Sequence, residues 1–177
     1  MSDSKRLGEF DLIAHCFAPL VKDTPGALGL LDDAALLSPT PGCELVLTAD
    51  AMIAGRHFFD DDPPDLVARK LLRVNLSDLA GMGARPRGFL VTAAWNAETG
   101  DAWVEAFARG LGEDARDFAC PLLGGDTTAT EGPLALSLTA LGEVSRGKAL
   151  RRAGARPGEL LAVTGTIGDG ALGLLVQ

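Results

Sequence analysis

The sequence predicts an α/β domain in which helices pack on one face of a mixed or antiparallel β-sheet, as in an α+β sandwich. Short apolar runs that favour strands alternate along the chain with longer runs whose apolar residues recur at helical spacing. Gly-rich and Pro-rich turns separate these runs, and the chain of 177 residues, 47% of them hydrophobic, is long enough to bury a core.

Three segments have the spacing of amphipathic helices. The first is "FDLIAHCFAPLV", residues 10–21, which ends near Pro25 and Gly26. The second, residues 60–83, begins with acids and prolines and closes on glycine. The third covers residues 99–118, with Thr99 or Asp101 as the expected N-cap.

Four segments are predicted to be strands because they are short, apolar and bounded by turn residues. They are "CELVLTAD" (43–50), "PRGFLVTAAW" (86–95), "ACPLLGGDTT" (119–128) and "PLALSLTALGEV" (133–144).

The composition changes after residue 144. Residues 145–159, "SRGKALRRAGARPGE", are basic and rich in turn residues, which is typical of a linker or a domain edge. Residues 160–177 then favour a further strand, turn and helix. We therefore expect one domain over residues 1–150, and a linker with the start of a second, truncated domain over residues 151–177.

The composition also limits the classes of partner that the protein can bind and the cellular compartment in which it is expected. The net charge of -8 and the pI of about 4.7 argue against a nucleic-acid partner, and no apolar run is long enough to span a membrane. The N-terminus lacks the apolar core of a signal peptide. Three widely spaced cysteines fit reduced, buried thiols in a cytoplasmic protein.

Two phosphate-binding patterns occur in incomplete form. "GEVSRGKA" (142–149) lacks the Ser or Thr of a P-loop, and "GDGALG" (168–173) lacks the acid that follows a dinucleotide-binding turn. Of the two histidines, His15 lies in a predicted helix and is expected to be structural. His57 lies in a polar loop, where the structural and functional interpretations are equally plausible.

Acidic residues recur in one setting, beside apolar residues at the ends of predicted elements: Asp32 and Asp33, Asp50, Asp78, and Asp126. Two unit charges about 4 Å apart repel by ~4 kcal/mol at an effective dielectric near 20, so such a cluster needs protons or cations. Oxygen ligands, with the hydroxyls of Thr48, Ser77 and Thr127 beside them, suit Mg²⁺ better than Zn²⁺. A multi-carboxylate Mg²⁺ site favours nucleotide chemistry.

The alternative is that these acids are helix caps and turn residues, where Asp is common. For any single position this interpretation is the stronger one. We expect Asp50 and Asp126 to be brought close by neighbouring strands, and Asn75 and Asp78 to share one helix face. The sequence alone does not show that the four sites converge.

Ten segments in order resemble the thiamine-monophosphate kinases, a family of the aminoimidazole ribonucleotide synthetase-like superfamily. They are "GEFDLIA", "DDAALL", "LTAD", "GRHF", "DPPDL", "VNLSDLAGMGARP", "LLGGDTT", "GPLALSLTALGEV", "ALRRAGARPGE" and "VTGTIGD". The resemblance implies a two-domain fold, a homodimer paired through the sheet, and phosphorylation of thiamine monophosphate by ATP with Mg²⁺ as cofactor.

The resemblance also implies roles for individual residues. The metal ligands would be Asp33, Thr48, Asp50, Asp78 and Asp126. Gly125, Asp126 and Arg152 would contact ATP, and His57 would face the thiamine substrate. Asn75 would position the turn around Asp78, and no general base stands out.

The chain departs from the family pattern at three places. Leu31 replaces a glycine, Ala49 replaces a threonine, and no arginine follows "GGDTT". Two other functions therefore stay open: another ATP-using synthetase of the same superfamily, or a catalytically silent module for nucleotide binding or dimerisation.

Overall fold

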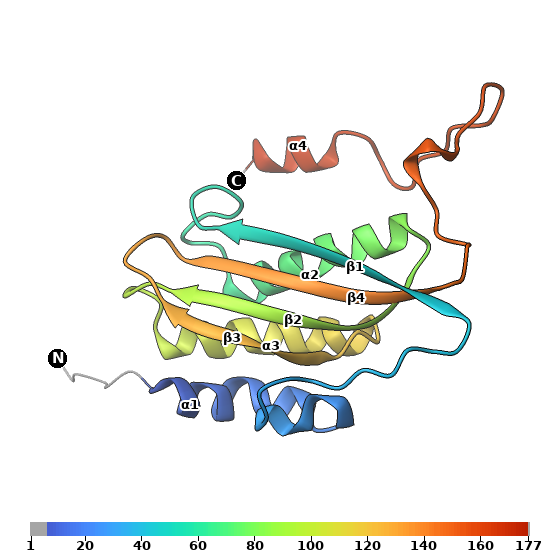
Figure 1. Ribbon diagram of the computed structural model, residues 1–177. Helices are drawn as coiled ribbons and strands as arrows, with labels where there is room; N and C mark the ends of the chain where they lie inside the picture. Colours follow the sequence, from blue (N-terminus) through green and yellow to red (C-terminus); the bar gives the residue numbers. More distant parts are fainter. Residues whose placement is uncertain (1–6, 177) are drawn as a thin grey trace.

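Four strands form one mixed sheet in the computed structural model, which describes residues 7–176 (Figure 1). The strands are β1 (Cys43–Ile53), β2 (Arg85–Trp95), β3 (Leu122–Ala129) and β4 (Ala135–Ser145). Their order across the sheet is β1-β4-β2-β3. The β2–β3 pair is parallel, whereas β4 is antiparallel to both β1 and β2, so the predicted mixed sheet is confirmed.

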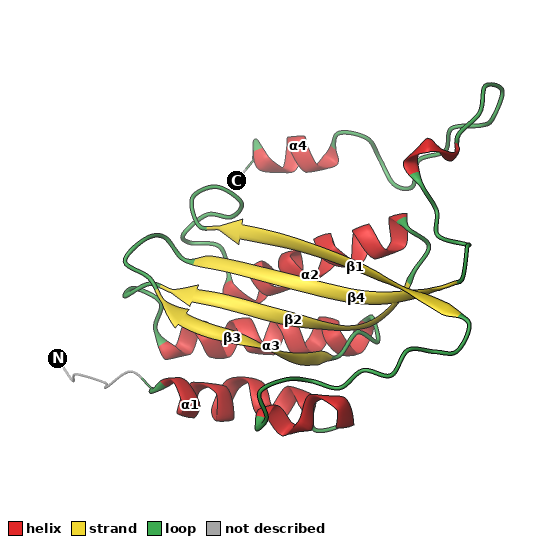
Figure 2. Cartoon of the chain, in the orientation of Figure 1, coloured by secondary structure: helices red, strands yellow, loops and turns green. Residues whose placement is uncertain are grey.

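Two long helices cover one face of this sheet (Figure 2). They are α2 (Pro64–Gly81) and α3 (Asp101–Asp117), and they pack against each other as well as against the sheet. Pro64 is well suited to the first position of α2, because it has no amide hydrogen and an amide there would have no partner within the helix. The helix connecting β2 to β3 is α3, as a parallel pair requires a crossover.

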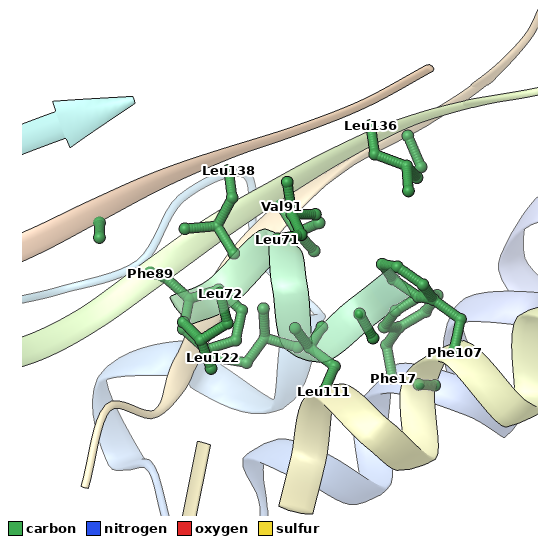
Figure 3. Close-up of a cluster of buried hydrophobic side chains, with 14 of the residues drawn as sticks. Phe17, Leu71, Leu72, Phe89, Val91, Phe107, Leu111, Leu122, Leu136 and Leu138 are labelled. Atoms are coloured by element: carbon green, nitrogen blue, oxygen red, sulfur yellow. The ribbon is translucent and has the colours of Figure 1, made fainter. Parts of the chain in front are cut away.

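The core lies between the sheet and these helices (Figure 3). Leucines of α2 and α3 meet inward-facing side chains of β2 and β4; the labelled members include Leu71, Leu72, Leu111, Phe89 and Leu138, all fully buried. Burying one such side chain stabilises the fold by ~2 kcal/mol.

The N-terminal segment forms a helical run that packs against α3 and β3. It contains α1 (Glu9–Leu12), a π-helical turn (Ile13–Phe17), and the 3₁₀ turns Ala18–Val21 and Pro25–Leu30. The predicted helix over residues 10–21 is thus present, but its hydrogen-bond pattern changes twice. Pro19 is one physical reason, because it has no amide hydrogen to continue an α-helical pattern.

Both tryptophans belong to a single aromatic cluster where β2 meets α3. The ring centroids of Trp95 and Trp103 are 6.1 Å apart, and Trp103 stacks on Phe107 at 5.4 Å. Edge-to-face and stacked ring pairs of this kind stabilise packing beyond the area they bury. The cluster fixes the position of α3 on the sheet.

No helix or strand within residues 7–176 covers the face of the sheet opposite α2 and α3 (Figure 2), and the loop before β1 lies against this face at Glu143 of β4. Leu47 of β1 and Leu90 of β2 are 63% and 38% exposed there, and Leu45 is also exposed. Pairing places Leu47 opposite Leu141 and Leu90 opposite Thr139, so these side chains share one face. The open face is therefore partly apolar.

Two predictions of secondary structure from the sequence are wrong. The N-cap of α3 is Gly100, because Thr99 bonds to Asn96 Oδ1 and Asp101 accepts the Leu7 amide. Residues 160–164 form no strand, since no neighbouring strand lies beside them in the part of the chain that the structure describes. They are followed by the short helix α4 (Asp169–Leu174), and residues 151–176 are exposed throughout.

Among the described residues, no helix is long and apolar enough to cross a membrane.

One charged side chain lies wholly inside the domain, at the α2–α3 contact. Asp114 of α3 accepts hydrogen bonds from Arg69 and from Arg73 of α2, with Nε of Arg73 2.6 Å from Oδ2. Burial raises the pKa of the Asp114 carboxyl, but the hydrogen bonds and charges of Arg73 and Arg69 outweigh it and lower that pKa below its ordinary value. The carboxylate is therefore ionised and binds the two helices together.

We predict that Asp114→Asn lowers the free energy of unfolding by about 2–3 kcal/mol, because two arginines lose a buried partner but remain partly hydrated. Urea denaturation measures this, with the exposed Asp117→Asn of the same helix as control. The folded pKa of Asp114 is below the unfolded value of 3.8, so its contribution is complete above that value and is lost as the pH falls through the folded pKa. Equal stability of both variants at neutral pH would contradict this.

Candidate functional site

Three of the predicted metal ligands gather where β1 passes over the end of α2, and we call them the β1–α2 cluster: Thr48, Asp50 and Asp78. The Thr48 hydroxyl donates a hydrogen bond of 2.7 Å to Asp78 Oδ2. Asp50 lies two residues further along β1 and so points to the same face as Thr48. The cluster offers only oxygen atoms, which are the ligands that Mg²⁺ prefers.

The polar residues inside α2 have separate roles. Asn75 is wholly buried and its Nδ2 donates to the Leu71 carbonyl of its own helix at 2.9 Å, whereas its Oδ1 has no partner among the described residues. Asp78, one turn later, is exposed and reaches Thr48. Near the end of α2, the Asn75 amide is therefore turned into the core and the Asp78 carboxylate toward the surface.

A pocket of about 790 Å³ adjoins the β1–α2 cluster, and we call it the His57 pocket. Asp50 and His57 line it with the cations Arg56 and Lys70, over an apolar floor that includes Phe58. His57 Nδ1 accepts the Ile53 amide at 3.1 Å. A neutral ring held in this way carries its proton on Nε2, and this N–H is the group left to donate to a ligand.

A second pocket, of about 700 Å³, wraps around the edge of the sheet at β3, and we call it the β3 pocket. Asp32 and Asp33, from the loop before β1, line it together with Gly125 and Asp126 of β3. Apolar side chains of the core, such as Phe107, form its deeper wall. Two of the acidic segments that the sequence singled out therefore meet here.

A left-handed turn leads the chain into this pocket. Leu28, Gly29 and Leu30 have φ values of 51°, 69° and 59°, a conformation that leucine rarely adopts. Leu31, where the family resemblance implies a glycine, has an ordinary φ of -107° and is 90% exposed. The backbone strain therefore lies at Leu28 and Leu30 and not at Leu31. The sequence does not predict this turn, because no residue type typical of a left-handed conformation occupies those two positions.

The two groups of acids lie apart within one chain. Asp50 is on β1 and Asp126 is on β3, the opposite edges of the sheet, with β4 and β2 between them. Three strand spacings amount to about 14 Å, and strand pairing places the two residues on opposite faces, since Asp50 aligns with Leu138 and Asp126 with Thr92. The expectation that neighbouring strands bring them together is wrong, because it required a strand order the sequence does not reveal.

No group of three or more His, Cys, Asp or Glu residues that could hold a metal ion occurs among residues 7–176. Arg152 lies in the exposed 3₁₀ turn Arg152–Gly154 and lines neither pocket. No helix directly follows "GEVSRGKA", and "GDGALG" lies almost wholly within the six-residue helix α4, so neither incomplete motif forms a phosphate loop here. His15 bonds Glu105 at 3.2 Å on the surface, as expected of a structural residue.

Comparison with known proteins identifies the family. The family model described as AIR synthase related protein, N-terminal domain, matches residues 31–144, and the chain belongs to this family. Thiamine-monophosphate kinase of Caulobacter vibrioides is 53% identical over 169 residues, which are 96% of this chain and 48% of that protein. The enzyme of Escherichia coli K12 is 44% identical over 96% of this chain and 51% of its own length. The chain thus spans about half the length of these relatives.

Solved structures give the same result. Thiamine-monophosphate kinase from Stenotrophomonas maltophilia K279a has a TM-score of 0.70 at 44% identity, covering 82% of this chain and 45% of that one. AaThiL complexed with AMPPCP and TMP has a TM-score of 0.71 at 30% identity, covering 99% of this chain and 55% of that one. The predicted α/β fold and the family resemblance are therefore both confirmed.

Gly125 has a structural reason to be glycine, independent of any ligand. A Cβ on this residue would lie 1.8 Å from the Val91 carbonyl oxygen, whereas a Cβ on Gly124 would meet only Leu90 Cδ2 at 3.5 Å. The first contact is impossible without a backbone shift, and the second is ordinary.

We predict that Gly125→Ala destabilises the domain by about 1–3 kcal/mol through displacement of β3 from β2. Gly124→Ala is the matched control and should change stability by less than about 0.5 kcal/mol. Urea denaturation of both variants measures the difference, and similar midpoints would show that the β2–β3 approach is not as tight as described.

Proposed function

We propose that this chain contributes the ATP- and Mg²⁺-binding part of an enzyme that phosphorylates thiamine monophosphate to thiamine diphosphate. The observation that carries the proposal is the β3 pocket, which brings Asp32 and Asp33 to Gly125 and Asp126. A relative of similar fold is complexed with AMPPCP and TMP, and 99% of this chain aligns with it. A pocket in a shared fold thus supports the proposal.

The chemistry of the donor atoms fits Mg²⁺ and a nucleotide. Asp33 and Asp126 at the β3 pocket, and Thr48, Asp50 and Asp78 in the β1–α2 cluster, offer oxygen alone. Bound Mg²⁺ would neutralise the phosphate oxygens during transfer. The residues of the chain would hold and orient the nucleotide, which is the main requirement of phosphoryl transfer. For Arg152 we propose a contact with ATP through movement of its exposed segment.

The His57 pocket is the candidate site for thiamine monophosphate. Its cations, Arg56 and Lys70, suit the phosphate of that substrate, and Asp62 suits its positively charged ring system. His57 would donate from Nε2, because Nδ1 is engaged by the Ile53 amide. Asp50 joins this pocket to the β1–α2 cluster, so substrate and metal would lie side by side.

A second copy of the chain is proposed to cover the open face of the sheet. The two groups of acids are on opposite edges and faces of one sheet, so one copy does not form a single site. Exposed Leu45 and Leu47 of β1, with Leu90 beside the β3 pocket, form an apolar surface that favours burial. A homodimer through this face would also add acids of the partner to those of this chain.

We propose a domain boundary near residue 150, because the residues beyond it are exposed while the sheet and its helices end before it. Residues 151–177 would then belong to the linker and to a second domain. Buried, unpaired Cys16 and Cys120 agree with a reducing cytoplasm. Burial, with the nearby carboxylates of Glu105 and Asp101, raises the pKa of the Cys16 thiol to about 11, so this thiol is protonated and unreactive.

We predict that Asp126→Asn lowers the rate of ADP release from ATP and thiamine monophosphate by about 100-fold or more in the whole protein, since a charge on the metal and phosphate site is lost. The exposed Glu131→Gln, in the turn after β3, should leave the rate unchanged. Unchanged turnover in D126N would count against the proposal. Binding of AMPPCP without turnover in the parent protein would favour a silent nucleotide-binding module, and turnover with another substrate would favour a related synthetase.

We predict that the parent chain is a dimer at micromolar concentration and that Leu47→Asp yields monomers, because a charge replaces an apolar side chain on the open face. Sedimentation velocity measures both masses. Leu66→Asp, an exposed leucine of α2, is the matched control and should remain dimeric. A monomeric parent protein would exclude pairing through the sheet.

A further inference from the structure

The loop that carries Asp32 and Asp33, residues 31–42, is fastened to the sheet by a small group of polar side chains. We propose that Glu143 and Arg87, with Thr40, form a clamp that positions this acidic loop for metal and nucleotide binding. The inference rests on the proposed function, but the clamp itself is a feature of the folded chain and can be tested without any ligand.

Glu143 is the centre of the clamp. It lies on β4 and is only 4% exposed. Its Oε1 accepts the backbone amide of Thr40 at 2.8 Å, and the Thr40 hydroxyl also bonds this carboxylate. These hydrogen bonds, with the charge of Arg87, lower the pKa of Glu143 to about 2. The carboxylate is therefore ionised at any pH at which the protein is expected to act.

Arg87 completes the clamp from the neighbouring strand. Its Nη1 forms an ion pair with Glu143 Oε2 and donates to Thr40 Oγ1 at 2.8 Å, while Nη2 donates to the Ser38 carbonyl at 3.4 Å. The register of β2 against β4 shifts between Pro86 and Gly88, so Arg87 is the extra residue of a bulge. Bulges re-aim side chains, and this one turns Arg87 toward the loop.

The loop has a second attachment between the clamp and the acids. The Leu36 amide donates to the Gly26 carbonyl at 2.7 Å, and a Cβ on Gly26 would lie 2.1 Å from the Leu36 carbonyl oxygen. Asp32 and Asp33 precede this contact directly and are themselves exposed at the β3 pocket. A third attachment lies at the end of the loop, where the Arg146 amide donates to the Gly42 carbonyl at 3.0 Å. Among the described contacts of the loop, the clamp is the only charged attachment.

A purely structural ion pair would also place Glu143 and Arg87 together, and the experiment must separate the two roles. The probe for the clamp is hydrogen–deuterium exchange of the amides of residues 31–42, read beside amides of the core strands. The probe for positioning is the affinity of the whole protein for AMPPCP as Mg²⁺ is raised. A loss of stability alone would raise exchange throughout the domain and would not change the Mg²⁺ dependence.

The variant is Glu143→Gln, which keeps the size of the side chain and removes its charge. The matched control is Glu44→Gln on β1, a carboxylate that likewise accepts a backbone amide, from Gly147 at 2.9 Å, a residue outside the acidic loop. Thr40→Val is a second variant, because it removes the hydroxyl from the loop side and leaves the Glu143–Arg87 pair intact.

We expect E143Q to raise exchange at Thr40 and across residues 31–42 by about tenfold, with core strands nearly unchanged, and to weaken Mg²⁺-dependent AMPPCP binding by about tenfold, a loss of roughly 1.4 kcal/mol. T40V should show both effects to a smaller extent, and E44Q neither. Loop exchange equal to that of E44Q would overturn the clamp. Faster loop exchange with unchanged nucleotide affinity would overturn its positioning role. A parent protein that binds no AMPPCP would instead contradict the proposed function.

Discussion

The packing of α2 and α3 on one face of a four-stranded sheet is the constraint on which the rest of the structure depends. It buries the apolar faces of both helices and leaves the other face of the sheet without a covering helix or strand within the described chain. It also decides where polar groups can go. Asp78 reaches Thr48 because α2 crosses beneath β1, and Asp126 is exposed because β3 lies at the far edge. The candidate sites are thus consequences of how the core is closed.

Much of the fold can be predicted from the periodicity of the sequence, and the reasons for the failures are physical. Both long helices and all four strands were expected, because each has a strong apolar pattern between clear turn residues. The order of the strands was not, since pairing depends on contacts between residues far apart in the chain. Residues 160–164 have strand-like composition, but a strand exists only when it has a partner. The predicted N-cap of α3 was wrong because Thr99 bonds to Asn96 and Asp101 accepts the Leu7 amide.

The candidate site shows the same division between local and long-range information. The types of residue were readable: oxygen ligands beside apolar elements, and a histidine in a polar loop. The grouping of these residues in space could not be predicted. Asp50 and Asp126 are separated by two strands, and the sequence does not reveal the order of the strands in the sheet. The left-handed turn at Leu28–Leu30 and the clamp at Glu143 gave no local signal, since leucines and a glutamate are ordinary in their surroundings. Such positions are recognised only when coordinates show what each side chain touches.

The aromatic cluster at the junction of β2 and α3 has a practical consequence for spectroscopy. The chain has two tryptophans and no tyrosine, and both tryptophans lie in that cluster with Phe107. Tryptophan fluorescence and near-ultraviolet circular dichroism will therefore report how α3 packs against β2. They will respond little to rearrangements around the acidic segments. An optical melting curve of this chain describes the unfolding of its core, and ligand-induced ordering elsewhere needs a label introduced at that place.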